Sequence, residues 1–485
     1  MAEGPWGFNS PLSHQDARPC PMAPRPLITL LILLGLPALS AVPQTPAPTA
    51  HGQRARDIFQ QLIEFDTTDE HGATTPAAEA LARRLQDAGL PAADIHVLGP
   101  TPNKGNLVAR LRGTGAKRPL LLLAHLDVVE ARREDWSIDP FTFQERDGFF
   151  YGRGAQDIKD GAAVLVANLI RLAEAHYQPN RDLILALTAD EEGGTANGVR
   201  WLLADHRELI DAEFCVNLDG GDFQKSKGRR LAAPIQAAEK AYADFTLEVT
   251  NRGGHSSLPT DDNAIYHLAA ALTRIAAHTF PARLNDVTRG FFAARAALEP
   301  PAVASDMRAV AAAEPPPEAI ARLSTDTYFN AQLRTTCVAT QVTAGHAANA
   351  LPQRARANVN CRLLPDESLD GVKATLVRVV HDPAVIVSAP AARPNPISPV
   401  RQDLLAVTSE VAARVYPGVL VVPTMETGGT DGRSLRIAGI PTYGMSGIFI
   451  DEDDVRAHGR DERVGVQDFY DGLEFNYQLV RALTQ

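Results

Sequence analysis

The sequence predicts an α/β protein in which a mostly parallel sheet is flanked by helices and a smaller α+β domain is inserted into the chain. Three observations support this prediction. From residue 55 to about residue 237, apolar strand-like runs alternate with helical patterns. Near Ala243 the pattern changes to strands in which apolar and polar residues alternate, and after about residue 392 the first pattern returns. Strands alternating with helices build parallel sheets, whereas alternation within a strand is typical of antiparallel sheets with one solvated face.

The first segment, residues 55–241, contains three predicted helices with apolar periodicity, at 55–65, 75–89 and 161–177. Short β-rich runs separate these helices, at residues 106–113, 119–129, 182–190 and 213–219.

The second segment, residues 242–392, is predicted to be the inserted domain, with two helices and about four antiparallel strands. Its strands are expected at residues 244–252, 332–342, 354–365 and 384–390, and its helices at 264–278 and 367–380. The stretch 291–323 is rich in Ala and Pro, and we interpret it as a helical excursion from this domain. In residues 393–485 the α/β pattern returns and ends in a helix at 468–484.

Composition limits the classes of function. The chain has 485 residues, of which 45% are hydrophobic and 22% charged, so it has ample material for a large core. The net charge is −11 and the isoelectric point is about 5.7. The sequence has no basic tract, which argues against nucleic acid as a partner.

The N-terminal residues predict export to the periplasm or the extracellular space. Arg25 precedes an apolar run, 27–41, which is too short to span a bilayer comfortably and ends in small residues. We therefore interpret residues 1–41 as a signal peptide and residues 42–54 as a disordered linker. A short membrane anchor is the alternative, but no second long apolar segment would hold the mature chain in a membrane. Met22 is an alternative start to Met1.

Three cysteines remain outside the leader: Cys215, Cys337 and Cys361. An odd number argues against a disulfide framework. Cys337 and Cys361 both lie in strand-like runs, so they are either neighbours or separate buried thiols. The sequence favours buried thiols.

Histidine and carboxylate residues follow the ends of several apolar runs. In an α/β sheet, the carboxyl ends of the strands are where ligand sites form. Two imidazoles and several carboxylates can hold two divalent metals and leave a position for water. The residues in question are His125, Asp127, Asp157, Glu191, Glu192, Asp219 and His458.

Two pairs within this set are informative. His125 and Asp127 alternate along an extended segment, so both side chains can face one site, with the carboxylate fixing an imidazole. Glu191 and Glu192 are adjacent, and two neighbouring carboxylates need a cation or a shared proton. A surface turn and a solvated acidic turn are the respective alternatives. The apolar strand before Glu191 and the two glycines after Glu192 argue against the second.

The order of motifs resembles a known family. The chain contains, in order, HLD, GRGAQDIKDG, ADEEGG, NLDGG, GGHSSLP, NALP with NCRLLP, GGTDGR and AHGRDERV. This set is similar to that of the di-zinc aminoacylase/carboxypeptidase family, which includes glutamate carboxypeptidase, carnosine dipeptidase and succinyl-diaminopimelate desuccinylase. The resemblance extends from about residue 55 to the end. It looks closest to the carboxypeptidase S and N-fatty-acyl-amino-acid hydrolase branch.

The resemblance implies a dinuclear zinc site, with cobalt or manganese as alternatives. Asp157 would be the bridging carboxylate between the two ions. His125 and Asp219 would complete one site, and Glu192 and His458 the other.

The same resemblance implies the catalytic roles. Glu191 would be the general base and acid, and Asp127 would orient His125. His255 in the inserted domain would reach the active site of a neighbouring subunit and bind the developing oxyanion, which implies a homodimer built on that domain. The residues expected at the substrate are Asn349, Arg362, Gly429 and Arg433, with Thr430 and Asp431 in the same loop as Gly429.

The expected function is hydrolysis of an amide bond next to a free carboxylate. The substrate would be a small peptide or an N-acyl amino acid. An N-acyl-amino-acid amidohydrolase is the alternative, since the chemistry is the same and only the acyl pocket differs. A catalytically dead binding protein is the third reading, and the presence of every expected ligand and of Glu191 argues against it.

Overall fold

The computed structural model describes residues 49–391 and 393–485. The predicted signal peptide, residues 1–41, lies outside the described residues. No helix within the described part of the chain is long and apolar enough to cross a membrane.

The first helix, α1 (Ala50–Ile63), begins inside the segment that the sequence assigned to a linker. Thr49 caps this helix, because its side chain accepts a hydrogen bond from the Gly52 amide at 3.1 Å. Ile58 and Phe59 are fully buried. The linker prediction is therefore wrong from residue 50 onwards.

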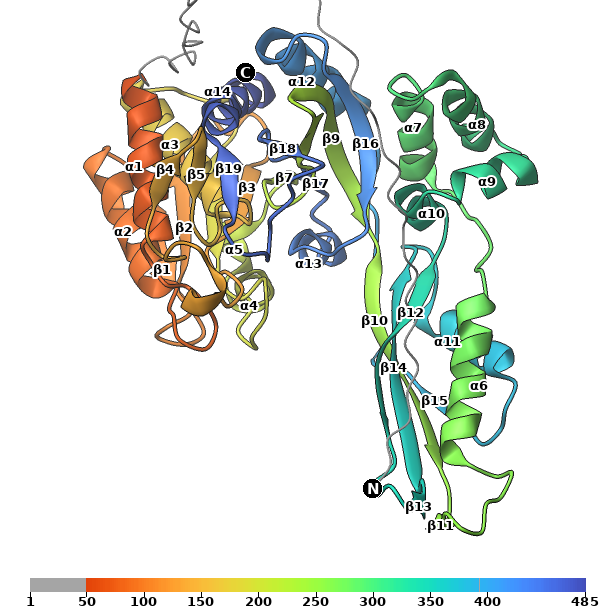
Figure 1. The fold of residues 1–485 in the computed structure, drawn as a ribbon. Coiled ribbons are helices and arrows are strands. Elements are labelled where there is room, and N and C mark those ends of the chain that lie inside the picture. The colour runs from red at the N-terminus through yellow and green to blue at the C-terminus, as the bar shows by residue number, and fades with distance from the viewer. Residues whose placement is uncertain (1–48, 392) are drawn as a thin grey trace, which may run out of the picture. The chain divides into compact units, whose positions relative to one another are not determined.

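The largest sheet has ten strands and is mixed, with a parallel centre (Figure 1). Strand β3 pairs in parallel with both β6 and β7, and β17 continues in parallel from β7. Antiparallel pairs occur toward the edges, between β1, β2 and β6 and between β8 and β9. The predicted mostly parallel α/β sheet is thus confirmed. The strands lie in the order β1 (Ile95–Leu98), β2 (Asn106–Leu111), β6 (Leu183–Thr188), β3 (Leu120–His125), β7 (Phe214–Asn217), β17 (Thr442–Gly444), β9 (Arg229–Glu239), β8 (Phe223–Ser226) and β18 (Phe449–Asp451), with β16 (Leu420–Glu426) also paired on β9.

Helices cover both faces of this sheet, as expected for a parallel sheet. Residues of β3 alternate between the two hydrophobic cores: Leu120 and Leu122 belong to one, and Leu121 and Leu123 to the other. The first core is completed by α1, α2 (Thr75–Asp87), α3 (Lys159–Glu174), α12 (Gln402–Val415) and α14 (Val466–Leu483). The second is completed by α4 (Gly198–Asp205), α5 (Arg207–Ile210) and α13 (Gly432–Ile437).

A second sheet has four antiparallel strands, which the alternating pattern predicted. Its order is β12 (Thr336–Ala344), β14 (Arg354–Leu363), β10 (Ala241–Thr250) and β15 (Ile386–Ser388). Helices α6 (Ala264–Ala277) and α11 (Leu369–Val380) pack on one face of this sheet. Beyond β10, a short antiparallel pair joins β11 (Gly254–His255) to β13 (Ala350–Leu351).

The Ala- and Pro-rich stretch forms helices, as predicted, but it packs against the large sheet and not against the small one. Phe292, Met307 and Val310 share a core with Ala232 of β9 and Val422 of β16. The stretch was interpreted as a helical excursion from the inserted domain, and this interpretation is wrong about where the helices pack. The helices are α7 (Asp286–Arg295), α8 (Pro301–Ala311), α9 (Pro317–Leu323) and α10 (Thr327–Leu333).

Cys337 and Cys361 form a disulfide, which corrects the expectation of buried free thiols. The reason is register: β12 pairs with β14 so that the two cysteines lie directly opposite one another, with their Cα atoms 4.1 Å apart. Cys215, at the start of β7, is a buried free thiol.

A three-stranded antiparallel sheet connects two loops that are distant in sequence. It contains β4 (Gln144–Arg146), β5 (Phe149–Tyr151) and β19 (Arg463–Gly465). Elsewhere in the chain, short 3-10 helices lie at Ala92–Asp94 and Arg133–Asp135. The segment after β5 leads to Asp157, and the segment before β19 contains His458. Pairing of β5 with β19 brings these two segments together.

Candidate metal and catalytic site

Three neighbouring strands end at the same edge of the large sheet. His125 is the last residue of β3, Glu191 and Glu192 follow β6, and Asp219 follows β7. Because β3 pairs in parallel with β6 and β7, the carboxyl ends of all three strands meet at this edge.

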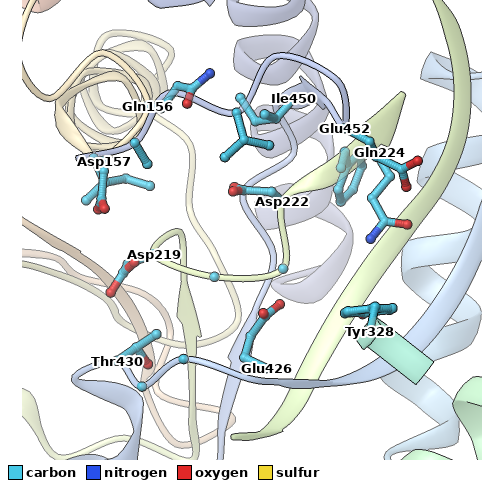
Figure 2. Close-up of a pocket in the computed structure, with 18 residues that line it drawn as sticks. Gln156, Asp157, Asp219, Asp222, Gln224, Tyr328, Glu426, Thr430, Ile450 and Glu452 are labelled. Atoms are coloured by element: carbon cyan, nitrogen blue, oxygen red, sulfur yellow. The ribbon is translucent and has the colours of Figure 1, made fainter. Parts of the chain in front are cut away.

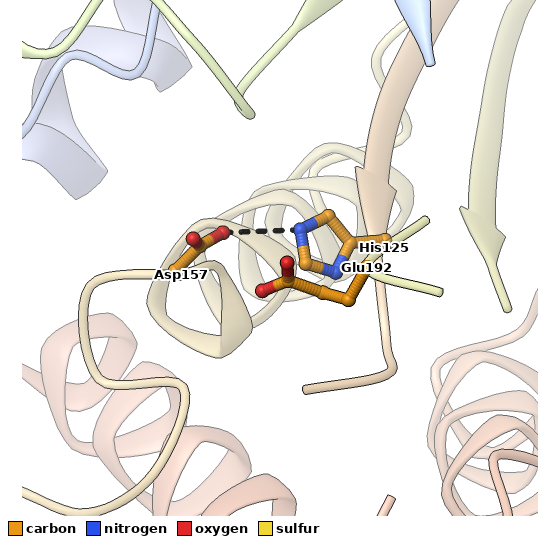
Figure 3. A group of neighbouring side chains, drawn as sticks. All are labelled: His125, Asp157 and Glu192. Carbon is orange, nitrogen blue, oxygen red and sulfur yellow. Dashed lines mark hydrogen bonds and ion pairs between the residues drawn. The ribbon is translucent and has the colours of Figure 1, made fainter. Parts of the chain in front are cut away.

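Asp157 lies between the two histidines, with one carboxylate oxygen facing each imidazole. Its Oδ1 is 3.1 Å from Nε2 of His125, and its Oδ2 is 3.0 Å from Nε2 of His458 (Figure 3 shows the contact with His125). This arrangement is what a carboxylate that bridges two cations requires.

The remaining ligand-type side chains lie close to this centre. Nε2 of His458 is 2.9 Å from Oε1 of Glu192. Potential ligand atoms of His125, Asp157 and Glu192 all lie within 4.8 Å of one another, and the same holds for His125, Glu191 and Asp219. The structure thus brings together His125, Asp157, Glu191, Glu192, Asp219 and His458.

The electrostatics of this cluster show a shortage of positive charge. Burial, followed by the charge of Asp219, raises the pKa of Glu191 well above its usual range. Burial likewise raises the pKa of Asp219, although His125 opposes the shift. Burial also disfavours ionisation of Asp157, but hydrogen bonds from His125 and His458 outweigh it and hold the pKa of Asp157 below its usual range. Two imidazoles are too few cations for four carboxylates.

Divalent metal ions fit this donor set. Imidazole nitrogens and carboxylate oxygens are the ligands that zinc uses in catalytic sites, and manganese or cobalt accepts the same types. Two cations would neutralise the carboxylates that burial otherwise forces toward protonation. The geometry therefore gives two candidate groups of metal ligands, one of His125, Asp157 and Glu192 and one of His125, Glu191 and Asp219.

The pKa of His458 predicts how metal binding depends on pH. Hydrogen bonds to Asp157 and Glu192 raise the pKa of His458 to about 10, although burial opposes this. A pKa above neutrality means that His458 carries a proton at pH 7, and a metal must displace that proton. We expect zinc binding to release protons and to tighten as pH rises from about 6 to 8. Calorimetry in buffers of different protonation enthalpy measures the release, and pH-independent binding without proton release would contradict this expectation.

Asp127 makes contacts beyond the one with His125 that the sequence suggested. Nδ1 of His125 lies 2.9 Å from the main-chain oxygen of Asp127, so the backbone orients the ring, while the nearest carboxylate oxygen is 3.7 Å away. The carboxylate also accepts hydrogen bonds from the amides of Glu191 at 3.1 Å and Glu192 at 3.0 Å. Asp127 therefore positions the Glu191–Glu192 turn.

This arrangement predicts the outcome for an Asp127 variant. Asp127→Asn keeps the size of the side chain and the main-chain oxygen that contacts His125. Its side chain has only one oxygen, however, so it cannot accept from both the Glu191 and the Glu192 amides. We expect kcat to fall about 10- to 100-fold, which is typical for losing an orienting partner. Metal content by elemental analysis should fall much less than the rate. A parallel loss of metal would instead favour a role through His125.

Glu462 is a positioning residue that the sequence did not reveal. It is fully buried and pairs with Arg153 at 2.6 Å. Its two oxygens also accept from the amides of Gly154, Gln156 and Asp157, at 3.1, 2.7 and 3.1 Å. Because Glu462 follows His458 by four residues, it ties the loop of His458 to the loop of Asp157. An acidic residue within a charged loop gives no sequence signal for such burial.

Side-chain hydrogen bonds from neighbouring elements hold the Gly-rich loop before α13. Asp431 accepts hydrogen bonds from Asn197 Nδ2 at 2.6 Å and from Thr188 Oγ1 at 3.3 Å. Thr430 donates to Glu239 at 3.2 Å, and Glu239 pairs with Arg436 at 2.6 Å, with both side chains of this pair buried. Glu239 is the last residue of β9, so it connects the loop to the point where the chain leaves the large sheet.

Two cavities border the ligand-type cluster. A cavity of about 1200 Å³ is lined by Glu191, Glu192 and His458 together with residues of the second segment. A cavity of about 300 Å³ is lined by Asp157 and Asp219 (Figure 2). Gly428 and Gly429 line both.

Of the predicted substrate residues, three line these cavities. Arg362 lines the large cavity, and its guanidinium lies 4.8 Å from the centre of the Tyr242 ring. Gly429 lines both cavities. Arg433 also lines the large cavity, but it donates to the main-chain oxygens of Arg393 and Pro394, each at 3.0 Å. Arg433 therefore holds the segment that returns to the large sheet.

His255 and Asn349 lie elsewhere. Both are at the β11–β13 pair, where the amide of Ser256 donates to the main-chain oxygen of Asn349 at 3.0 Å. His255 is exposed, and its Nδ1 is 2.7 Å from Oγ of Ser257. Neither residue lines the two cavities within the described chain.

Comparison with known proteins places this site in a family. The sequence model of Peptidase family M20/M25/M40 matches residues 121–482. The human N-fatty-acyl-amino acid synthase/hydrolase PM20D1 is 30% identical over 374 residues, covering 75% of this chain and 74% of its own length. The probable carboxypeptidase S-like 2 of Dictyostelium discoideum is 28% identical over 376 residues, covering 75% of this chain and 71% of its own.

Solved structures agree in fold. An M20 family metallo-carboxypeptidase from Sulfolobus solfataricus superposes with a TM-score of 0.67 at 18% identity, covering 88% of this chain and 98% of that chain. The YXEP protein of Bacillus subtilis, described as a dinuclear metal binding peptidase from the M20 family, superposes with a TM-score of 0.57 at 14% identity, covering 90% and 99%. The family match contains all six ligand-type residues that the structure brings together. The chain therefore belongs to peptidase family M20/M25/M40, and it is a metal-binding hydrolase of peptide or amide bonds.

Proposed function

We propose that the protein is a dinuclear zinc exopeptidase that cleaves the amide bond next to the free carboxylate of a dipeptide or short peptide. The observation that carries this proposal is Asp157, whose two oxygens face His125 and His458. Zinc suits the nitrogen and oxygen donors, with cobalt or manganese as the alternative metals. When bound, two such cations would polarise the scissile carbonyl and lower the pKa of water.

Glu191 is the proposed general base and acid. Its main chain is fixed by the carboxylate of Asp127 at 3.1 Å, and its side chain lines the large cavity beside the metal cluster. Burial and Asp219 raise its pKa, so Glu191 readily holds a proton taken from water. The same proton can then pass to the leaving amine.

Arginines in the large cavity support recognition of a substrate carboxylate. Arg200 and Arg362 line this cavity together with Glu191, and a guanidinium matches the planar geometry of a carboxylate. Arg433 is better explained as a structural contact, because main-chain oxygens already occupy two of its donors. We further propose that residues 242–392 act as a lid over this cavity, since Tyr242 and Arg362 line it.

A second candidate is an N-acyl-amino-acid amidohydrolase. The relatives favour this alternative, because the human protein described above is named an N-fatty-acyl-amino acid synthase/hydrolase. The reaction at the metal cluster would be the same, and the substrate would differ only on the acyl side.

A zinc-loaded activity screen tests the function. Purified protein would be assayed on dipeptides and on N-acyl amino acids that share the same carboxyl-terminal residue, with free amino acid as the measured product. Hydrolysis of dipeptides supports the exopeptidase, and exclusive hydrolysis of long-chain N-acyl amino acids supports the alternative. No hydrolysis of either class by metal-loaded protein would refute both.

We also propose that the chain is exported. The Cys337–Cys361 disulfide supports export independently of the N-terminal sequence, because disulfides persist mainly in oxidising compartments. The mature N-terminus, measured by mass spectrometry of the exported fraction, should lie near residue 42. Full-length protein confined to the cytoplasm would contradict this proposal.

A homodimer through the second segment is the proposed oligomer, with His255 acting in the partner's active site. Strand β12 is at the edge of the four-stranded sheet, and its Val338 and Val342 are 60% and 57% exposed. An open edge with exposed apolar residues favours pairing with another chain. The position of His255 outside both cavities of its own chain is consistent with action in trans.

Complementation tests this dimer. His255→Ala and Glu191→Gln proteins should each be inactive, whereas a mixture after subunit exchange should regain part of the wild-type rate. One hybrid site then contains both an intact His255 and an intact Glu191. Size-exclusion chromatography with light scattering establishes the dimer and the exchange. No recovery despite exchange would mean that His255 acts within its own chain or has no catalytic role.

A further inference from the structure

The two cavities beside the metal cluster differ in that only one of them has cationic side chains among its described lining residues. The large cavity has four arginines on its wall, Arg200, Arg362, Arg393 and Arg433, together with six carboxylates and His458. The small cavity has no Lys, Arg or His among its described lining residues, but it has carboxylates beyond the proposed metal ligands. Gly428 and Gly429 line both cavities, so a substrate held at the cluster can reach each of them.

Asp222 and Glu426 are the two carboxylates that define the small cavity. Figure 2 shows them on the wall between Asp157 on one side and Tyr328 on the other. Asp222 follows Asp219 by three residues, and Glu426 ends β16, so both are fixed by the edge of the large sheet. A third carboxylate, Glu452, is 3.9 Å from Arg295 and already has a cationic neighbour. Asp222 and Glu426 have no such partner among the described ion pairs.

The rest of the wall limits the size of the ligand. Phe223, Ile450 and Val455 contribute apolar surface, and Tyr328 of α10 forms part of the far side. Helix α10 belongs to the helical stretch that packs on the large sheet, so this stretch helps to close the small cavity. A long hydrocarbon chain would have to displace water from two carboxylates without replacing their hydrogen bonds, which is costly. A short group that carries a positive charge would satisfy both.

We propose that the small cavity binds the free ammonium group of a dipeptide, with Asp222 and Glu426 as the residues that select it. The carboxylate of the same substrate then lies toward Arg200 and Arg362 of the large cavity, so each end of a zwitterion has an oppositely charged side chain to contact. This inference rests on the proposed exopeptidase function and names its substrate class. It makes uncharged N-acyl amino acids poor substrates.

Matched substrates isolate the ammonium group. L-Alanyl-L-leucine and N-propanoyl-L-leucine differ only in that group, and L-leucyl-L-phenylalanine and N-(4-methylpentanoyl)-L-phenylalanine form a second pair. We expect kcat/KM of the wild-type enzyme to be about 10- to 150-fold higher for the dipeptide of each pair, the range that a hydrogen bond to a charged group contributes. Calorimetric binding to Glu191→Gln protein should show the same preference without turnover.

Two variants assign this preference to the cavity. Asp222→Asn and Glu426→Gln should each reduce the dipeptide preference at least about 10-fold, while hydrolysis of the propanoyl substrate stays within a factor of about two. Glu314→Gln removes one exposed carboxylate outside both cavities and should change neither substrate. Thermal unfolding checks the fold of each variant, and either variant alone suffices if the other does not fold.

The outcomes separate this inference from the proposed function. Equal kcat/KM for both members of each pair would overturn the ammonium site and leave the exopeptidase chemistry standing. Equal losses for both substrates in the two variants would overturn it as well. No hydrolysis of any substrate by zinc-loaded wild-type protein would overturn the proposed function and the ammonium site together.

Discussion

Glu191→Gln is expected to lower kcat by about 10²- to 10⁴-fold, the range that a positioned general base contributes. The amide is isosteric with the carboxylate, but it cannot take a proton from water. The main-chain hydrogen bond from residue 191 to Asp127 is independent of the side chain, so the turn should keep its shape. Zinc content and melting temperature should therefore remain close to those of the wild type, as elemental analysis and calorimetry can establish.

Glu314→Gln is the matched control for this variant, because it makes the same chemical change at an exposed position. It should retain wild-type activity. A Glu191→Gln enzyme that keeps more than about a tenth of wild-type kcat would remove Glu191 from the mechanism. If activity and zinc are lost together, Glu191 is better described as a ligand.

Asp157→Asn is expected to have the largest effect on metal binding. An asparagine has only one oxygen, whereas both oxygens of Asp157 face an imidazole, at 3.1 and 3.0 Å. Loss of a shared ligand weakens both metal positions. Loss of an orienting partner lowers metal affinity about 10- to 100-fold, and we expect the affinity for zinc to fall further than that in Asp157→Asn. Bound zinc, measured after dialysis against a weak chelator, should drop below one ion per chain, and activity should disappear.

Asp205→Asn provides the control for that change, since Asp205 is exposed at the end of α4. It should bind zinc like the wild type. Two ions retained by Asp157→Asn would mean that Asp157 does not bridge, and that the two metal positions are independent.

Much of the site could be predicted because strand ends are visible in sequence. His125, Glu191 and Asp219 each follow an apolar run, and parallel pairing of those runs brings their ends together. The long strand β9 was missed, however, because Arg229–Glu239 is rich in Ala and contains Pro234, which are unfavourable in strands. In the fold, β16 and β8 flank this strand, and these tertiary contacts override its weak propensity.

Other features depend on contacts between distant residues and leave no local signal. The Cys337–Cys361 disulfide follows from the register of β12 on β14. The carboxylate of Asp127 lies 3.7 Å from His125, on which it was expected to act, but it also accepts hydrogen bonds from the amides of a turn more than sixty positions later. Sequence patterns identify which residue types end a strand, but they do not determine which N–H groups a carboxylate meets.

The most direct test of the dinuclear site is anomalous X-ray diffraction at the zinc edge from crystals of zinc-loaded protein. We expect two peaks per chain, separated by about 3.5 Å as in other two-metal sites. Both peaks should contact Asp157, one should also contact His125 and Asp219, and the other Glu192 and His458. A single peak, or two peaks that share no ligand, would contradict the dinuclear site proposed for this chain.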